Sequence, residues 1–233
     1  YKTSKGVYFD TSKLEKYGRT LSNNNMEELL AGARIEVDNE KRNPQDFALW
    51  IKAPQEHIMK WDSFMGLCYP GWHIECSAMS RKYLGESFDI HTGGVDHIPI
   101  HHENEIAQSE AANGVPFAKY WMHNAFLNID NKKMSKSAGN FFTVRDIAEK
   151  YDLQVLRFFM LSAHYRSPLN FSADLMEAAK NGLERMITCA DKLNSYLINE
   201  NMGKDLSETE KRLLEDASKY NDRYNEAMDD DFN

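Results

Sequence analysis

The chain has 233 residues, a length that fits one large domain or two smaller ones and allows a sizeable core. Its 42% apolar and 27% charged residues exclude a disordered chain, and no apolar run approaches the roughly 20 residues that span a bilayer. A net charge of −8 excludes a uniformly basic nucleic-acid binder, so any contact with nucleic acid must use a local basic patch. The three widely spaced cysteines, Cys68, Cys76 and Cys189, favour a reducing cytosol over a disulfide framework.

The first 44 residues are polar, with a strand expected at 7–9 and a helix at 26–33. From Asp46 the pattern of apolar residues changes and predicts, in order, a strand at 47–51, a helix at 72–84, a strand at 88–91, a turn at Gly93 and Gly94, a helix at about 100–112 and a strand-like run at 121–129. Strands that alternate with helices favour an α/β fold with a parallel sheet.

After Asn140 the sequence becomes helical. Capping signals mark three helix starts: Thr143 with Asp146, Asp152 before a helix that runs to 161, and Ser207 with Glu210. Between them, apolar residues at three- and four-residue spacing predict an amphipathic helix with one face to bury: Leu175, Ala179, Leu183, Met186, Leu193 and Leu197. The aspartates at 229–231 are expected to start a loop.

A group of histidines is the densest polar cluster, because four of the eight histidines lie between His91 and His102. On a helix, Glu105 shares a face with His101, four residues away, or with His102, three residues away. Imidazole and carboxylate on one face form half of a zinc site, and Cys76 on an upstream element can add a thiolate. The alternative is a solvated helical face with Cys76 as a small buried hydrophobic residue.

Two further segments carry candidate chemistry. Gly93 and Gly94 follow a strand and precede Asp96, so backbone can approach a ligand closely and the carboxylate can accept hydrogen bonds from ribose hydroxyls. An ordinary tight turn is the alternative. The second segment, K-K-M-S-K-S-A-G-N at 132–140, suits a loop that closes over polyphosphate and stabilises a leaving pyrophosphate. A generic basic loop is the alternative there.

The string K-M-S-K-S at 133–137 matches the motif of class I aminoacyl-tRNA synthetases. Three longer stretches resemble the cysteinyl-tRNA synthetase family: G-W-H-I-E-C-S-A-M at 71–79, D-I-H-T-G-G-V-D at 89–96 and H-H-E-N-E-I-A-Q-S at 101–109. Shorter matches at 41–44, 140–143 and 228–233 extend the similarity over nearly the whole chain. The resemblance implies an α/β fold: the second half of a Rossmann-like class I synthetase catalytic domain, followed by an α-helical stem-contact segment and anticodon-binding bundle.

The resemblance also implies the site residues. In that family an active-site zinc binds the thiolate of the substrate cysteine, and the implied ligands are Cys76, His101 and Glu105 rather than His102 or Glu103. Trp72 is implied to lie beside the substrate cysteine, with a place in the core as the alternative. The resemblance assigns ATP binding to Lys136, His91, Gly93, Gly94 and Asp96, and a catalytic role to Lys133 and Lys136. Zinc takes a thiolate far more readily than the hydroxyl of serine, so a separate editing domain is unnecessary.

The implied reaction uses ATP with Mg²⁺ to convert cysteine into cysteinyl-adenylate and then transfers the cysteinyl group to tRNA(Cys). Two family features are missing from the sequence, the H-I-G-H motif and a fourth zinc-ligand cysteine, both of which lie near the N-terminus in the family. We therefore expect a fragment that begins inside an inserted connective module and cannot complete aminoacylation by itself. The implied domains are the end of that module at 1–44, the second half of the nucleotide-binding catalytic domain at 45–132, the K-M-S-K-S loop and stem-contact segment at 133–170, and the start of the helical anticodon-binding domain at 171–233.

Two other functions share parts of this pattern. A related cysteine ligase would make the same adenylate and pass it to an amino sugar, although the helical second half favours tRNA. A zinc-stabilised RNA-binding fragment without catalysis is the other, and the intact 133–137 loop argues against it. The expected protein is a monomeric cytoplasmic enzyme without membrane contact, and its partners are tRNA(Cys), cysteine and ATP.

Overall fold

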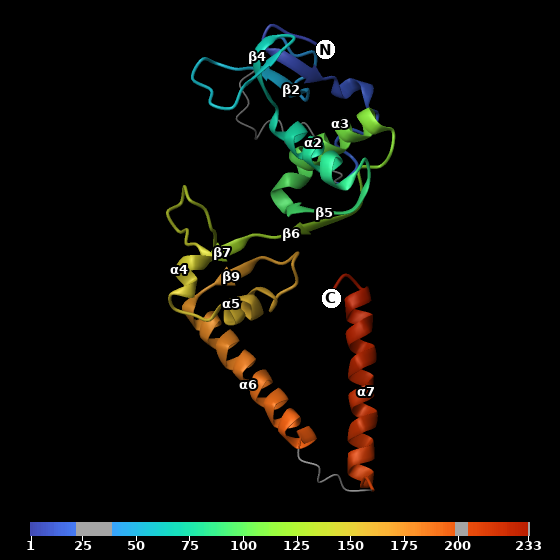
Figure 1. Cartoon of the computed structure of the whole chain (residues 1–233), viewed down its shortest axis with the longest axis vertical. Coiled ribbons are helices and arrows are strands. Elements are labelled where there is room, and N and C mark those ends of the chain that lie inside the picture. Colours follow the sequence, from blue (N-terminus) through green and yellow to red (C-terminus); the bar gives the residue numbers. More distant parts are fainter. Residues whose placement is uncertain (22–38, 199–204, 233) are drawn as a thin grey trace. The chain divides into compact units, whose positions relative to one another are not determined.

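The computed structural model describes residues 1–21, 39–198 and 205–232 (Figure 1). The helix predicted at 26–33 and the last residue of the motif at 228–233 lie outside these residues. The chain divides into two compact units, Tyr1–Asn124 and Ala125–Asn233. In the described ranges, no helix combines the length and the apolar character that crossing a bilayer requires.

The first unit begins with a four-stranded antiparallel sheet in the order β1-β2-β4-β3. Its strands are β1 (Gly6–Phe9), β2 (Phe47–Lys52), β3 (Trp61–Ser63) and β4 (Gly66–Pro70), and a short 3-10 helix η1 (Thr11–Lys13) follows β1. The buried carboxylate of Asp46 ties the N-terminal segment to β2, because it accepts hydrogen bonds from the Tyr1 hydroxyl at 2.5 Å and from the backbone and hydroxyl of Thr11 at 2.9 Å. The strands predicted at 7–9 and 47–51 are confirmed, but the expectation of a parallel sheet is wrong here.

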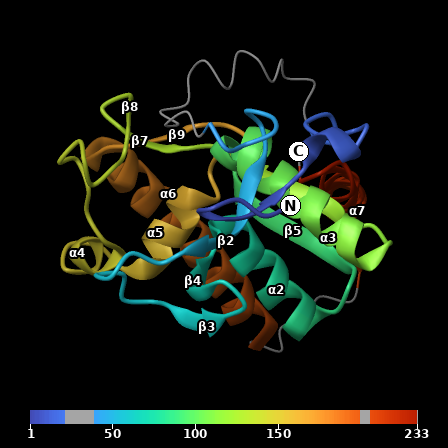
Figure 2. The same ribbon diagram turned by 90° about the horizontal axis from the view of Figure 1, so that it is seen from above.

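A parallel β-α-β unit completes the first unit. Helix α2 (Trp72–Leu84) leads into β5 (Phe88–Gly94), and a continuous helical run then connects β5 to its parallel partner β6 (Ala118–Asn124). The run consists of a 3-10 turn η2 (Val95–His97), a π-helical turn η3 (Ile98–His102) and α3 (Glu103–Asn113). Helices α2 and α3 lie side by side (Figure 2), joined by hydrogen bonds from Gln108 and Ser109 to the Ser77 hydroxyl. The α/β class is therefore confirmed.

Three predicted boundaries in this region need correction. Gly93 and Gly94 do not form a turn, because they are the last two residues of β5 and pair with His123 and Asn124 of β6. The helix expected at about 100–112 begins earlier as a helical run, and its α-helical part starts only at Glu103. The strand-like run at 121–129 is two strands, β6 and β7 (Leu127–Ile129), which belong to different sheets.

The second unit has a three-stranded sheet in the order β8-β7-β9, formed by β7, β8 (Lys132–Lys133) and β9 (Leu169–Phe171). Strands β7 and β9 are parallel. Strands β7 and β8 form a hairpin whose two turn residues, Asp130 and Asn131, have φ of 50° and 59°. Two left-handed residues in a two-residue hairpin turn match the twist of the strands, and Asp and Asn tolerate that conformation well.

The described residues of the second unit also form four helices: α4 (Val144–Ala148), α5 (Leu153–Met160), α6 (Ala173–Ile198) and α7 (Glu208–Asp229). All three predicted helix starts are confirmed, because Thr143 and Ser207 form capping boxes and the Asp152 side chain accepts from the Gln154 N–H. Helix α7 ends at Asp229, as expected for a loop at 229–231.

Helix α6 buries its apolar face over only part of its length. Met176 and Ala179 pack with Val155 and Phe159 of α5 in the core of this unit, and Leu183 lies against the same cluster. Four residues of the predicted face are exposed among the described residues: Leu175 in the first turn, and Met186, Leu193 and Leu197 farther along. The prediction of an amphipathic helix is therefore confirmed, whereas burial of the whole face is not.

Candidate functional site

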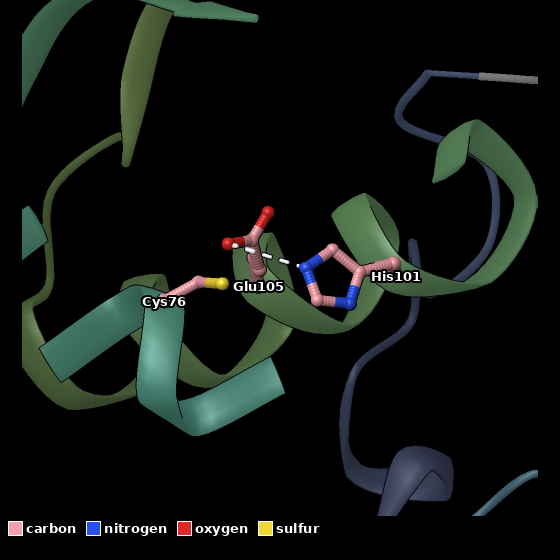
Figure 3. Close-up of side chains that lie close together, drawn as sticks. All are labelled: Cys76, His101 and Glu105. Atoms are coloured by element: carbon pink, nitrogen blue, oxygen red, sulfur yellow. Dashed lines mark ion pairs between the residues drawn. The ribbon is translucent and has the colours of Figure 1, made fainter. Parts of the chain in front are cut away.

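The three predicted metal ligands lie close together (Figure 3). Cys76 comes from α2, His101 from the π-helical turn and Glu105 from the first turn of α3. Each offers one ligand atom, and these atoms all lie within 4.8 Å of one another. His101 is 7% exposed and Glu105 is 0% exposed, so the alternative of a solvated helical face is wrong.

The two carboxylate oxygens of Glu105 have different surroundings. Oε2 lies 2.8 Å from Nε2 of His91, whereas Oε1 is buried without a hydrogen-bond partner among the described residues. His101 Nε2 is 3.8 Å from Oε1, beyond hydrogen-bond range. A buried anionic oxygen without a partner is costly unless a cation compensates it. The residues present therefore fit a metal ion held between Glu105, His101 and Cys76.

The negative charge of Glu105 also changes the pKa of the Cys76 thiol. Burial and the negative charge of Glu105 raise the pKa of Cys76 to about 11, so without a cation the thiol stays protonated at neutral pH. A coordinated divalent metal ion reverses this effect, since it binds the thiolate and releases the proton. Thiolate, imidazole and carboxylate together are a donor set that zinc accepts.

Five further histidines lie around this cluster in the described part of the chain, and two of them were not singled out from the sequence. His73 of α2 places its Nδ1 2.8 Å from Nδ1 of His101, and His123 of β6 places its Nε2 2.8 Å from Nδ1 of His102. His73 lies three residues before Cys76, so helical spacing toward the same face could have indicated it. No local pattern in the sequence could have indicated His123, because strand pairing brings it to the site.

The pKa values of two histidines in this group are far below the ordinary value. Burial, with the nearby His101, lowers the pKa of His73 to about 4. Burial, with the nearby His91, lowers the pKa of His102 to about 3. Both rings are therefore neutral at physiological pH and can accept hydrogen bonds.

A second group of potential ligands shares Glu105. His91, His102 and Glu105 also present ligand atoms within 4.8 Å of one another. Geometry alone therefore does not choose between His101 and His102, and the ligand set implied by the family resemblance stays a prediction.

Trp72 is the first residue of α2, and its ring centroid lies 4.4 Å from that of His101. The residue is 60% exposed, so the alternative that it belongs to the core is wrong. An exposed aromatic ring beside a candidate metal ligand can form one wall of a pocket for a small substrate.

The two glycines at the end of β5 make room for neighbouring side chains. A Cβ at Gly93 would lie 2.5 Å from Cε1 of His102, and one at Gly94 would lie 2.5 Å from Oδ1 of Asp96. Asp96 itself is exposed in η2. Gly93 therefore has a packing reason to be glycine that is independent of any nucleotide.

The predicted phosphate-binding lysines lie in the second unit, whereas the other predicted site residues lie in the first. Lys133 belongs to β8, and its ammonium group is 3.7 Å from the ring centroid of Phe126. Lys136 follows in the loop, 5.4 Å from the ring centroid of Phe141. Asn140 closes this loop, because its side chain accepts from the Ser135 N–H at 3.0 Å and donates to the Lys133 carbonyl at 3.2 Å.

A model of the family described as tRNA synthetases class I (C) catalytic domain matches residues 1–181. The chain therefore belongs to this family. Curated relatives that align with the whole chain are 56% identical in Lachnospira eligens, 54% in Clostridioides difficile and 55% in Geobacter metallireducens, and each of these proteins is named cysteine–tRNA ligase. The chain spans about half the length of these relatives: 50%, 50% and 47%, respectively.

Among solved structures, the chain is similar to a LeuRS from Agrobacterium radiobacter in a ternary complex with tRNA and LeuAMS. The two share 16% sequence identity with a TM-score of 0.44, over 56% of this chain and 21% of that chain.

Proposed function

We propose that the full-length protein is a cysteine–tRNA ligase that activates cysteine with ATP and transfers it to tRNA(Cys). The observation that carries the proposal is the buried Oε1 of Glu105, which has no hydrogen-bond partner among the described residues and lies beside Cys76 and His101. The relatives that are 54–56% identical and carry this name support the same function.

In this proposal Cys76, His101 and Glu105 hold one zinc ion. The family resemblance implies a fourth protein ligand, a cysteine that lies nearer the N-terminus in the full-length protein. A zinc ion held there would take the thiolate of cysteine as an additional ligand in preference to the hydroxyl of serine. Trp72 limits the pocket beside His101, since its exposed ring lies 4.4 Å from the imidazole. The chain thereby selects cysteine by coordination chemistry and by pocket size.

Lys133 and Lys136 are proposed to bind the phosphates of ATP, which arrives with Mg²⁺, and to stabilise charge on the leaving pyrophosphate. The contact of Lys136 with Phe141 is a cation–π contact of a kind worth about 0.5–1 kcal/mol at exposed sites, so moving this ammonium group onto phosphate costs little. The ammonium group of Lys133 lies over the ring of Phe126. The closed loop at 133–140 supports this role, because it holds both lysines on one short segment.

Adenosine recognition is proposed for Asp96, His91, Gly93 and Gly94. Asp96 is the strongest member, because its exposed carboxylate can accept hydrogen bonds from both ribose hydroxyls. His91 lies against Glu105, and Gly93 lies against His102. Any contact of His91 with the nucleotide is therefore made by a side chain that also supports the proposed metal ligand Glu105.

The remaining assignments follow the family resemblance. We propose that residues 1–44 end a connective module, 45–132 form the second half of the catalytic domain, 133–170 contact the tRNA stem and 171–233 begin the anticodon-binding domain. The 26-residue α6 and the 22-residue α7 support a helical tRNA-contacting region. A monomeric enzyme that works in the cytoplasm completes the proposal.

ATP–pyrophosphate exchange by the full-length protein tests the first step. We expect exchange with cysteine, none with serine, and loss of exchange when zinc is removed by a chelator and its recovery when zinc is returned. Charging of tRNA(Cys) in place of an amino sugar then tests the acceptor. Absence of exchange from zinc-loaded protein would overturn the proposal in favour of a non-catalytic RNA-binding role.

A further inference from the structure

The two ring nitrogens of His101 have different neighbours. Nε2 is directed toward Oε1 of Glu105, 3.8 Å away, and Nδ1 lies 2.8 Å from Nδ1 of His73. Two neutral imidazole nitrogens at that distance share one proton, so one donates and the other accepts. The position of this proton decides whether His101 Nε2 carries a hydrogen or a free lone pair.

We propose that His73 is a positioning residue that accepts the Nδ1–H of His101 and so leaves Nε2 of His101 free to bind the metal ion. This inference rests on the proposed zinc site. A histidine that binds a metal ion commonly donates its other N–H to a fixed acceptor, which sets both the tautomer and the direction of the ring.

The opposite tautomer is less consistent with the geometry. It would put a hydrogen on His101 Nε2, but at 3.8 Å the Oε1 atom of Glu105 is too far away to accept it, and Oε1 has no other hydrogen-bond partner in the described part of the chain. The tautomer with the hydrogen on Nδ1 instead directs the Nε2 lone pair of His101 toward the space beside Oε1 of Glu105. A cation between these two atoms stabilises this arrangement.

The ring of His73, the proposed acceptor, is itself held in place by packing. His73 is the second residue of α2, and its ring meets Phe47 edge-on, with centroids 5.7 Å apart and an interplanar angle of 89°. Three residues later the same helix carries Cys76. Helix α2 therefore supplies one predicted ligand directly and orients a second one through His73. His91 gives Glu105 equivalent support at Oε2.

Zinc affinity of the full-length protein, measured by competition with a chelator, tests the inference with two variants. His73→Leu removes the acceptor, and we expect the zinc dissociation constant to rise about 10- to 100-fold. His73→Asn keeps an acceptor near the Nδ1 position, and we expect it to remain within about threefold of the original protein. The absorption spectrum of the Co²⁺-loaded His73→Asn variant should likewise match that of the original protein.

His123→Leu is the matched control, because it removes the partner of His102 from a histidine pair of the same length and leaves the His73–His101 pair intact. Its zinc affinity should not change. A loss of affinity in this control but not in His73→Leu would move the metal ion to His91, His102 and Glu105 and overturn the inference. Equal losses in His73→Leu and His73→Asn would overturn it too, since a packing role alone predicts that result.

Two further variants test the proposed zinc site independently of the role of His73. Cys76→Ser and Glu105→Gln should abolish stoichiometric zinc binding if the proposed site is correct. Zinc retained in both variants would refute the site and the inference together. Zinc lost in both variants but unaffected by His73→Leu would refute only the role of His73.

Discussion

Replacing Gly93 with alanine tests whether this residue is a glycine because of His102. The added Cβ would lie 2.5 Å from Cε1 and 2.7 Å from Nε2 of that ring. Ordinary contact begins at 3.4 Å, so the ring would have to retreat by 3.4 − 2.5 = 0.9 Å. His102 is only 2% exposed and is held by a 2.8 Å contact with His123, so it has little room to move. Overpacking of this kind typically costs about 1–3 kcal/mol.

Gly94→Ala is the matched comparison, because it adds the same methyl group one residue away. Its Cβ would meet Oδ1 of Asp96, the far end of a side chain that is exposed, whereas the His102 ring is buried. In urea unfolding at pH 7 we expect Gly93→Ala to lose about 1–3 kcal/mol and Gly94→Ala less than about 0.5 kcal/mol. Equal stability of the two variants, whether both match the original protein or both fall, would refute the reasoning.

Three further outcomes are expected. Glu105→Gln should lose bound zinc, measured by elemental analysis, whereas Glu103→Gln should keep it, because Glu103 instead accepts from the backbone N–H groups of Thr20 and Leu21. Lys136→Ala should slow ATP–pyrophosphate exchange about 100- to 1000-fold, whereas Lys132→Ala in the same hairpin should change it little. Burial raises the pKa of Asp46, but hydrogen bonds from Tyr1, Thr11 and Asn43 outweigh it and hold the pKa below the usual value. Its stabilisation is therefore present above the pKa of the unfolded state and lost as pH falls through the lower folded value, so Asp46→Asn should cost about 1–3 kcal/mol at pH 7 and progressively less in unfolding measured below pH 4.

Local signals in the sequence predicted the helices well. Helix α2 was expected at 72–84 and occupies Trp72–Leu84, and the capping signals at Thr143, Asp152 and Ser207 each begin a helix. Such signals depend on side chains within four residues of one another, so they can be recognised without knowledge of the fold.

The errors arose where distant segments decide the structure. The glycines at 93 and 94 indicated a turn, but pairing with β6 keeps them extended. The hairpin of β3 and β4 was missed, because its strands are short and an exposed Phe64 at the turn hides the usual alternation.

In the candidate site, too, contacts between residues close in sequence could be predicted, whereas contacts between distant segments could not. Spacing alone brought Glu105 together with either His101 or His102, since helical neighbours three and four residues apart share a face. His123 could not be found in this way, because its contact with His102 depends on the register of β6 against β5. The choice of His101 over His102 rested on the family resemblance and not on physical spacing.

The π-helical turn at Ile98–His102 has a consequence for engineering of this protein. Its hydrogen bonds reach one residue farther than those of an α-helix, so the turn holds an additional residue between β5 and α3. Deleting one residue there would restore α-helical winding and rotate the preceding segment by about 100° about the helix axis. His91 on β5, which belongs to the preceding segment, would then no longer face Oε2 of Glu105 on α3. The number of residues in this turn is therefore under a stricter constraint than the identity of Ile98 or Ile100, and a library that varies sequence at fixed length should retain metal binding more often than one that varies length.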